Sequence, residues 1–238
     1  MDDFCRPHPA TAPTAARPLL GLTVLVVEDS RYASDALRLM CLKSGARIRR
    51  ADSLRAARRH LRAYRPSVAI IDLGLPDGSG LDLIRDLTQP SSAGMTVLAF
   101  SGEETAEKPA LAAGANGFLA KPVVSLPAFQ AAILCHLPAE RRPPPLRSIS
   151  DTKVTPDPMT FADDLCHAAK VLQKSQNDAN LRYAAQFLSS LAQSAGDGAL
   201  KSEAEDLMAQ RRAGKPISPG LTRLSALLQQ RLQAQPQF

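Results

Sequence analysis

The stretch Val68-Ala-Ile-Ile-Asp-Leu-Gly-Leu-Pro-Asp-Gly-Ser-Gly80 decides the fold of this chain. A short apolar run leads directly into Asp72, a turn rich in Pro, Gly and Asp follows, and a helix is predicted to begin near Leu81. A continuous apolar run of this length is typical of a strand buried on both faces, as in a parallel sheet. Asp72 would then lie at the carboxyl end of the strand, where open α/β sheets bind their ligands. Taken alone, Asp72 could equally cap the following helix.

Other predicted strands also end in residues that carry chemistry. They are residues 22–27 before Glu28 and Asp29, residues 96–100 before Ser101, and residues 117–120 before Lys121. An acid pair, an aspartate, a hydroxyl and a lysine in this order resemble the receiver domain of two-component response regulators, over about residues 20 to 138. The alternation of strands and helices predicts an α/β fold with a doubly wound, flavodoxin-like parallel sheet of about five strands.

The acids at these strand ends favour a metal site. Three carboxylates about 4 Å apart repel one another by about 4 kcal/mol per pair at an effective dielectric constant of about 20. A site made of oxygen ligands with few protein groups suits Mg²⁺. We therefore expect Glu28, Asp29 and Asp72 to bind Mg²⁺, and the family resemblance adds the backbone carbonyl of Gly74.

The resemblance also implies a reaction. Asp72 would be the nucleophile that takes a phosphoryl group and becomes an aspartyl-phosphate. The metal and the Lys121 ammonium would neutralise charge on the transferring oxygens. In the receiver family, a hydroxyl at the position of Ser101 bonds the phosphate and is coupled to an aromatic switch residue, whose position Phe118 occupies. A cis peptide bond before Pro122 is suggested by the same resemblance.

The composition is that of a globular chain with a modest positive charge. Of its 238 residues, 45% are hydrophobic and 4% aromatic, and the formal net charge is +6. Part of the positive charge is local, in Arg47, Arg49, Arg50, Arg55, Arg58, Arg59, Arg62 and Arg65. Such a stripe could bind nucleic acid or an acidic partner. We favour a solvated helix face, because aromatic side chains for base stacking are scarce here.

The cysteines favour a reducing environment. Cys5, Cys41, Cys135 and Cys166 show no CxxC spacing, which argues against a zinc ribbon or a disulfide framework. Cys135-His136 and Cys166-His167 resemble metal-ligand pairs, but adjacent residues on a helix do not face one another. The chain shows no apolar run of about 20 residues and no apolar core of a secretory signal near its first residues. We therefore expect a cytoplasmic protein.

Four segments are expected along the chain. Residues 1–18 are predicted to be a disordered tail, 19–138 the receiver domain, 139–158 a linker around Pro143-Pro144-Pro145, and 159–238 an all-helical second domain. Within the receiver domain, a proline can start a helix but is disfavoured inside one. The fourth helix is therefore predicted to be short, near Ala110 to Ala113 and after Pro109. This shortening weakens the surface through which family members often dimerise.

Apolar stripes at helical spacing predict a four-helix bundle after the linker. Chain breaks are predicted at Asn177-Asp178, at residues 196–198 and at residues 214–216, and Ser218-Pro219 is a helix start. The stripes are Phe161, Leu165, Ala168 and Leu172; Leu181, Ala184, Leu188 and Leu191; Leu200, Ala204, Leu207 and Met208; and Leu221, Leu224, Leu228 and Leu232.

Residues 182–196 resemble the second half of a histidine phosphotransfer domain, and the likeness extends over about residues 159 to 232. That family carries a histidine, one residue, and then Leu-Lys-Gly. Here Gln186 stands at the histidine position, and Ser189 and Ser190 replace Lys and Gly. A glutamine amide cannot accept a phosphoryl group, so the resemblance implies a degenerate domain. His167 is a candidate substitute acceptor, although an ordinary helix histidine is the simpler interpretation.

These observations predict a Mg²⁺-dependent response regulator that accepts a phosphoryl group on Asp72 and signals by protein–protein contact. Its expected partners are a histidine kinase or phosphotransfer protein and a downstream protein, with a homodimer left open; neither DNA nor a membrane is expected. Two alternatives stay open: a phosphorelay intermediate that passes phosphate through the bundle, and a DNA-binding transcriptional regulator. The bundle shows no nucleophile elbow, metal cluster or Gly-rich loop, so we expect no enzymatic output.

Overall fold

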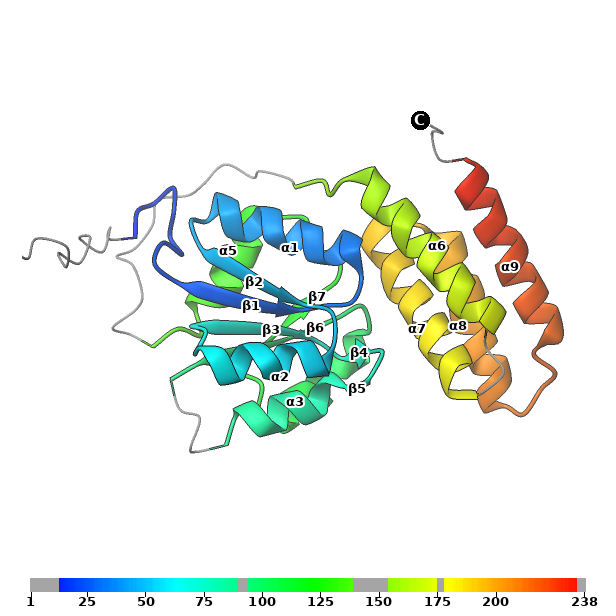
Figure 1. Ribbon diagram of the computed structural model, residues 1–238, viewed down its shortest axis with the longest axis horizontal. Coiled ribbons are helices and arrows are strands. Elements are labelled where there is room, and N and C mark those ends of the chain that lie inside the picture. Colours follow the sequence, from blue (N-terminus) through cyan, green and yellow to red (C-terminus); the bar gives the residue numbers. More distant parts are fainter. Residues whose placement is uncertain (1–12, 90–93, 139–153, 175–177, 235–238) are drawn as a thin grey trace, which may run out of the picture.

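The computed structural model describes residues 13–89, 94–138, 154–174 and 178–234. Figure 1 shows an α/β part, followed along the chain by a part made of helices. Most of the predicted tail, the triple proline of the linker and the predicted break at Asn177 lie outside the described residues.

A five-stranded parallel sheet forms the centre of the first part, as predicted, with the strand order β2-β1-β3-β6-β7. The strands are β1 (Thr23–Val27), β2 (Arg47–Ala51), β3 (Val68–Asp72), β6 (Thr96–Ser101) and β7 (Gly117–Ala120). A small antiparallel pair, β4 (Gly74–Leu75) and β5 (Gly78–Ser79), lies where the sequence predicts only a turn. The strand order reverses between β1 and β3, and such a switch point opens a crevice at the carboxyl ends of the strands.

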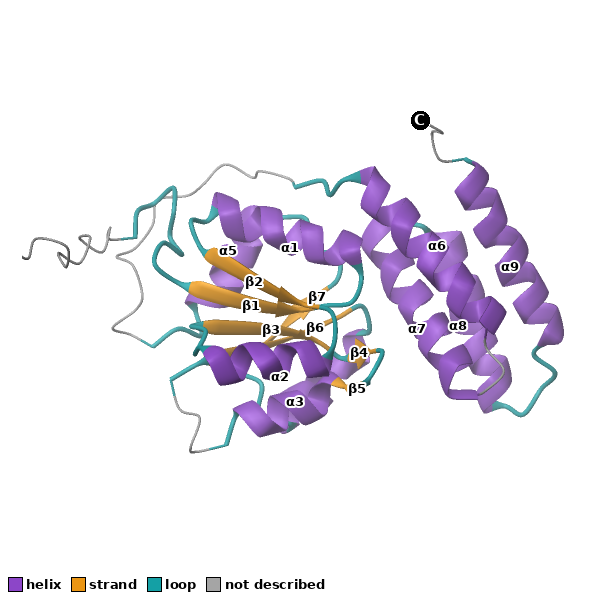
Figure 2. Cartoon of the chain, viewed as in Figure 1, coloured by secondary structure: helices purple, strands orange, loops and turns teal. Residues whose placement is uncertain are grey.

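Helices cover both faces of the sheet (Figure 2). On one face lie α1 (Arg31–Lys43) and α5 (Leu126–Leu134), and on the other lie α2 (Leu54–Ala63), α3 (Gly80–Leu87) and α4 (Glu107–Ala112). Because side chains alternate along a strand, β1 feeds two cores. Val24 and Val26 pack with α1 and α5, while Leu25 and Val27 pack with the other three helices.

The fourth helix begins earlier than predicted. A 3₁₀ turn, η2 (Glu104–Ala106), leads into α4 at Glu107, so Pro109 lies within the first turn of the helix. The first N–H groups of any helix lack an intrahelical acceptor, and a proline there costs no hydrogen bond. The expectation that Pro109 must precede the helix is therefore wrong. The expectation of a short helix is confirmed, since α4 has 6 residues.

The second part is a helical domain made of α6 (Pro158–Lys174), α7 (Asp178–Ala195), α8 (Gly198–Arg212) and α9 (Ser218–Gln233). These helices share one apolar core, to which all the predicted stripes contribute. The breaks after α7 and α8 fall where the sequence predicts them. Helix α6 starts at Pro158, the last residue of the predicted linker, and proline is favoured at helix starts.

The helical domain stands across the carboxyl ends of the strands (Figure 1). Helices α6 and α7 contact α1, and α7 also contacts β4. Helix α9 lies on the side of the domain away from the sheet. Among the described helices, we find none with the length and apolar character needed to span a bilayer.

Candidate functional site

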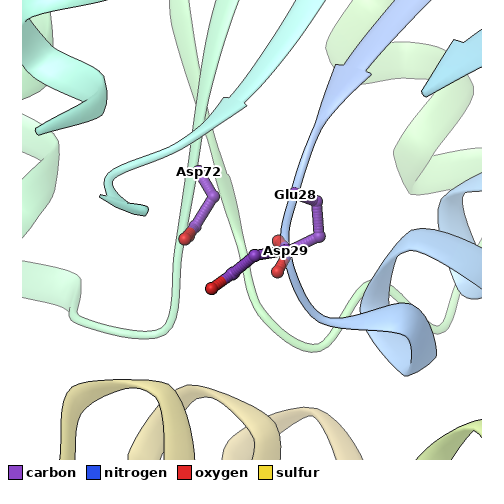
Figure 3. A group of neighbouring side chains, drawn as sticks. All are labelled: Glu28, Asp29 and Asp72. Carbon is purple, nitrogen blue, oxygen red and sulfur yellow. The ribbon is translucent and has the colours of Figure 1, made fainter. Parts of the chain in front are cut away.

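Three carboxylates converge at the carboxyl edge of the sheet (Figure 3). Glu28 and Asp29 directly follow β1, and Asp72 ends the neighbouring strand β3. One oxygen from each of the three lies within 4.8 Å of the others. The three carboxylates predicted as metal ligands are therefore brought together, and within the described ranges neither Cys–His pair joins such a cluster.

The loop that follows Asp72 is held tightly against it. The N–H of Gly74 donates to Asp72 Oδ2 over 3.1 Å, and the N–H of Gly80 donates to the carbonyl of Leu73 over 3.1 Å. A Cβ atom at Gly80 would lie 2.0 Å from the carbonyl oxygen of Asp72, so a larger residue cannot fit there. This close approach fixes the direction in which the Asp72 carboxylate leaves the strand.

Lys121 reaches the same carboxylates from the end of β7. Its Nζ atom lies 2.7 Å from Glu28 Oε2 and 2.9 Å from Asp72 Oδ1, and the side chain is fully buried. Although burial alone would lower the pKa of Lys121, Asp72 and Glu28 raise it above its usual value. The side chain is therefore a charged ammonium. The peptide bond from Lys121 to Pro122 is cis, as the sequence resemblance suggests.

The acids remain short of positive charge despite Lys121. Burial raises the pKa of Glu28 well above its usual value, with Lys121 opposing that effect. Burial and the Asp72 carboxylate raise the pKa of Asp29 to about 7. Both pKa shifts go in the direction expected when burial raises the free energy of the ionised carboxylates. A buried set of carboxylate oxygens beside one ammonium fits a hard, oxygen-preferring divalent cation such as Mg²⁺.

The two predicted switch residues occupy different surroundings. Ser101 ends β6, and its Oγ accepts a hydrogen bond of 3.2 Å from the N–H of Glu103. Ser101 lines one cavity together with Asp72. Phe118, on the neighbouring strand β7, is half-buried and packs against the core under α2, α3 and α4. It is not among the residues that line the cavity.

Helix α7 adds polar residues to the site that were not among its predicted residues. The hydroxyl of Tyr183 donates to Asp29 Oδ2 over 2.7 Å, and Lys121 Nζ donates to Ser190 Oγ over 2.9 Å. The amide of Gln193 donates to the carbonyl of Lys121 over 3.3 Å. With Gln186, these residues recur at i, i+3, i+7 and i+10, which is one face of a helix. We call Tyr183, Gln186, Ser190 and Gln193 the polar stripe of α7, a signal that was readable in the sequence.

Gln186 lies over the loop that follows Asp72. A Cβ atom at Gly74 would lie 2.8 Å from Gln186 Nε2. Gln186 and Ser190 line the same cavity as Asp72, and its volume is about 20 Å³. That is room for about one water molecule. His167 is exposed and its ring packs edge-on against Phe187; it does not line this cavity.

Asp164 of α6 binds the start of α1. Its carboxylate accepts hydrogen bonds from Ser30 Oγ over 2.8 Å, from the N–H of Arg31 over 3.1 Å and from the N–H of Tyr32 over 3.0 Å. Beside it, Arg31 forms an ion pair of 2.8 Å with Asp163. A carboxylate at a helix N-terminus also interacts favourably with the helix dipole. The start of α1, which follows the acid pair, is therefore bound to the helical domain.

A larger cleft, of about 1090 Å³, lies between the β2–α2 region and helices α6 and α7. Its lining includes arginines from the predicted basic stripe (Arg50, Arg55 and Arg59) together with His167 and Lys170 of the helical domain. The basic stripe is thus divided, because Arg58 instead forms an ion pair of 3.2 Å with Asp86. Cys166, which has a free thiol, also lines the cleft.

Comparison with known proteins decides the family of the first part. Residues 24–133 match the family model of the response regulator receiver domain. This part of the chain is a response regulator receiver domain. The chain is 34% identical over 160 residues to the KDP operon transcriptional regulatory protein KdpE of Escherichia coli, covering 66% of each chain. It is 35% identical over 103 residues to the virulence transcriptional regulatory protein PhoP of Salmonella typhimurium, covering 42% of this chain and 46% of PhoP.

The receiver domain also matches solved structures. A putative response regulator from Chloroflexus aurantiacus is 31% identical, with a TM-score of 0.41, over 42% of this chain and 85% of that chain. The chain spans just under two thirds of the length of KdpE and about half that of PhoP. Both relatives are named transcriptional regulatory proteins, which stands against the expectation that DNA is not a partner.

Proposed function

We propose that this chain is a response regulator of a two-component phosphorelay and that Asp72 accepts a phosphoryl group from a histidine kinase or a histidine phosphotransfer protein. The observation that carries the proposal is the Asp72 carboxylate, which lies beside two further acids and the buried Lys121 ammonium in a receiver domain. Structural ion-pair networks also bury charges, but they do not need three acids around one cation.

The reaction follows from the positions of these side chains. An oxygen of Asp72 attacks phosphorus; the P–O bond forms as the P–N bond to the donor histidine breaks. Lys121, 2.9 Å from Asp72 Oδ1, offsets the negative charge that reaches this carboxylate. Ser101 lines the same cavity, and its hydroxyl would donate to a phosphoryl oxygen. Glu28, Asp29, Asp72 and the carbonyl of Gly74 would hold Mg²⁺, which when bound neutralises phosphoryl oxygens.

The output would pass through the helical domain. A phosphoryl group adds about −1.5 to −2 charges at Asp72 and competes for the donors of Lys121, one of which now binds Ser190. Ser101 and Phe118 would transmit the change within the receiver domain. The helical domain acts as a degenerate four-helix phosphotransfer bundle, and the output is protein–protein contact.

Intact mass after incubation with Mg²⁺ and phosphoramidate tests the proposal. The wild-type chain is expected to gain one base-labile phosphate, and Asp72→Asn to gain none. Asp77→Asn is the matched control, because Asp77 is a neighbouring acid that accepts from the N–H groups of Leu54 and Arg55 and does not join the carboxylate cluster. An acid-labile, base-stable phosphate on His167 would favour a phosphorelay intermediate instead.

DNA-binding transcriptional regulation is a second candidate. The names of KdpE and PhoP favour it, as do the arginines and Lys170 in the cleft between the two domains. Phosphate contacts make binding fall steeply as salt rises. A mobility shift that weakens with salt and disappears in the triple variant Arg50→Ala, Arg55→Ala, Arg59→Ala would support this candidate. No shift at low salt, with or without phosphorylation, would remove it.

A further inference from the structure

The approach to Asp72 is restricted by the fold. Asp72 ends the central strand of a sheet that is covered by helices on both faces, so the carboxyl edge is the direction from which a phosphodonor can reach it. In the docked arrangement, α7 lies across that edge. Within the described part of the chain, the space left between Asp72 and α7 is about 20 Å³, room for about one water molecule. A phosphorylated imidazole is several times larger.

The contacts that hold α7 there involve the phosphoacceptor site itself. Tyr183 bonds Asp29, and the Lys121 ammonium donates to Ser190 as well as to Asp72, while its Nζ lies 2.7 Å from Glu28 Oε2. Asp164 adds three bonds to the start of α1. These are charge-assisted hydrogen bonds, which are the stronger kind. Docking of α7 therefore uses Asp29 and Lys121, two residues that the proposed phosphorylation also needs.

We propose that the helical domain blocks its own receiver domain in cis, because the polar stripe of α7 covers the surface on which a histidine-bearing helix of a phosphodonor must dock. The inference rests on the proposed phosphorylation of Asp72. The phosphodonor binds only after α6 and α7 have left this surface. The coupling is reciprocal: a phosphoryl group on Asp72 does not fit beneath α7 and displaces Ser190 from Lys121, so phosphorylation holds the helical domain away.

The position of Gln186 identifies the class of partner. On the polar stripe, Gln186 is the residue that reaches over Gly74 into the cavity that Asp72 lines. A partner helix docked in the same way would place an imidazole at this position against Asp72. The glutamine amide fills the place without being able to donate or accept a phosphoryl group. The surface thus fits a helical phosphodonor. Helix α7, which now covers this surface, resembles such a helix but carries an unreactive glutamine in place of the histidine.

A disulfide that locks the docked state tests this inference. A Cβ atom at Gly102 lies 3.5 Å from Gln193 Cβ, within the range that disulfides span. Gly102→Cys with Gln193→Cys joins the loop after β6 to α7, in a full-length chain in which Cys5, Cys135 and Cys166 are replaced by Ser. The same chain with Gly102→Cys alone is the control, because it carries the loop substitution and meets the same oxidant but cannot form the disulfide. Phosphate uptake from phosphoramidate and Mg²⁺ is followed by intact mass in oxidised and reduced samples.

We expect the oxidised double variant to take up phosphate at least about tenfold more slowly than the same protein after reduction, and the single variant to be indifferent to oxidation. Equal rates in the locked and reduced forms would overturn the inference while leaving Asp72 as the phosphoacceptor. Failure of the two thiols to join would overturn the docked arrangement. Absence of phosphate from wild type, single variant and reduced double variant alike would overturn the proposed function, and the inference with it.

Discussion

The hydroxyl of Tyr183 donates a hydrogen bond of 2.7 Å to Oδ2 of Asp29, and so joins α7 of the helical domain to the acid pair of the receiver domain. Burial, with a further contribution from Asp29, raises the pKa of Tyr183 above its usual value, so the phenol keeps its proton at neutral pH. One oxygen of a candidate metal ligand is therefore used by the helical domain. Docking and metal binding are expected to oppose one another at Asp29.

Removing this hydroxyl is expected to strengthen Mg²⁺ binding. Tyr183→Phe keeps the ring but frees Asp29 Oδ2, and a hydrogen bond to a charged group contributes about 1.5 to 3 kcal/mol. Isothermal titration should therefore give a Kd for Mg²⁺ about tenfold or more below that of wild type. Tyr64→Phe is the control, because that hydroxyl bonds His60 on α2, 3.2 Å away and outside the site. An unchanged or weaker affinity in Tyr183→Phe would refute the competition.

Loss of Asp164 is expected to loosen the docked state without altering the receiver chemistry. Asp164→Ala removes three bonds to Ser30, Arg31 and Tyr32 at the start of α1. The N–H groups of Arg31 and Tyr32 should exchange faster with deuterium, and phosphate uptake from phosphoramidate should be several-fold faster than in wild type. Asp206→Ala, at an exposed position on α8, is the control. Slower uptake in Asp164→Ala would count against the docked state as a block.

Lys121 is expected to stabilise the fold as well as the reaction. Removing one partner of a buried ion pair typically costs about 3 to 5 kcal/mol, because the remaining charges are left buried and unpaired. Lys121→Met should lower the midpoint of thermal unfolding markedly, and Mg²⁺ should raise that midpoint more than it does in wild type. Lys215→Met, at an exposed position, should change neither. Equal midpoints for both variants would show that Lys121 carries no structural charge balance.

Asp197 gives the helical domain a pH dependence of known sign. It caps α8 by accepting from the N–H of Leu200, and Arg231 of α9 lies 2.6 Å from its Oδ2. The hydrogen bond from Arg231 lowers the pKa of Asp197 below its usual value. The ionised Asp197 carboxylate therefore contributes its full stabilisation of the fold at pH values above about 3.9, the pKa of an aspartate in the unfolded chain. This contribution is lost as the pH falls through the lower pKa that Asp197 has in the folded state.

Two substitutions separate the cap from the charge. Asp197→Asn can still cap the helix, so at neutral pH it should lose only the ion pair, and its thermal midpoint should fall less than that of wild type on acidification below about pH 4. Asp197→Ala loses the cap as well, which costs a further 0.5 to 2 kcal/mol or so. If acidification lowers the midpoint of Asp197→Asn as much as that of wild type, the Asp197–Arg231 pair does not contribute.

Restoring a histidine on α7 is expected to create an internal phosphoryl acceptor. In Gln186→His, an α7 that has left the phosphorylated receiver domain would dock again in the position of a phosphodonor helix, with the phosphoryl group between His and Asp72. The imidazole would then attack the phosphoryl group of Asp72; the N–P bond forms, the P–O bond breaks and the imidazole loses a proton. Phosphoramidate treatment should then give an acid-labile, base-stable phosphate that depends on Asp72. The control Gln210→His, on α8, should give none. Absence of phosphohistidine in Gln186→His, while Asp72 is phosphorylated, would place Gln186 too far from Asp72.

The receiver fold and its acids were predictable because each signal is local. A buried strand is a short apolar run, and Asp72, Ser101 and Lys121 follow directly from such runs. Parallel strands bring these ends to one edge whatever the loops do. The helical stripes were predictable for the same reason, since packing follows a period of about 3.6 residues.

The arrangement of the two domains was not predictable from local signals. The hydrogen bond from Tyr183 to Asp29 joins residues 154 positions apart, and no pattern in either segment predicts its contact with the other. The polar stripe of α7 is visible in the sequence, but a polar face usually meets water. The start of α4 was misplaced for a different reason: the rule for proline inside helices does not hold in the first turn, where Pro109 lies.

Borohydride reduction of the phosphorylated chain identifies the acceptor residue itself. Borohydride converts an aspartyl-phosphate to homoserine and leaves a free carboxylate and a phosphohistidine unchanged, so peptide mass mapping after reduction reports the residue that carried the acyl phosphate. After incubation with phosphoramidate and Mg²⁺, we predict homoserine at position 72 in the wild-type chain, and none there when the phosphodonor is omitted. Phosphate bound to the chain with Asp72 intact in every peptide would contradict the assignment of Asp72 as the phosphoacceptor, as would homoserine at position 29 or the longer alcohol 5-hydroxynorvaline at position 28 in its place.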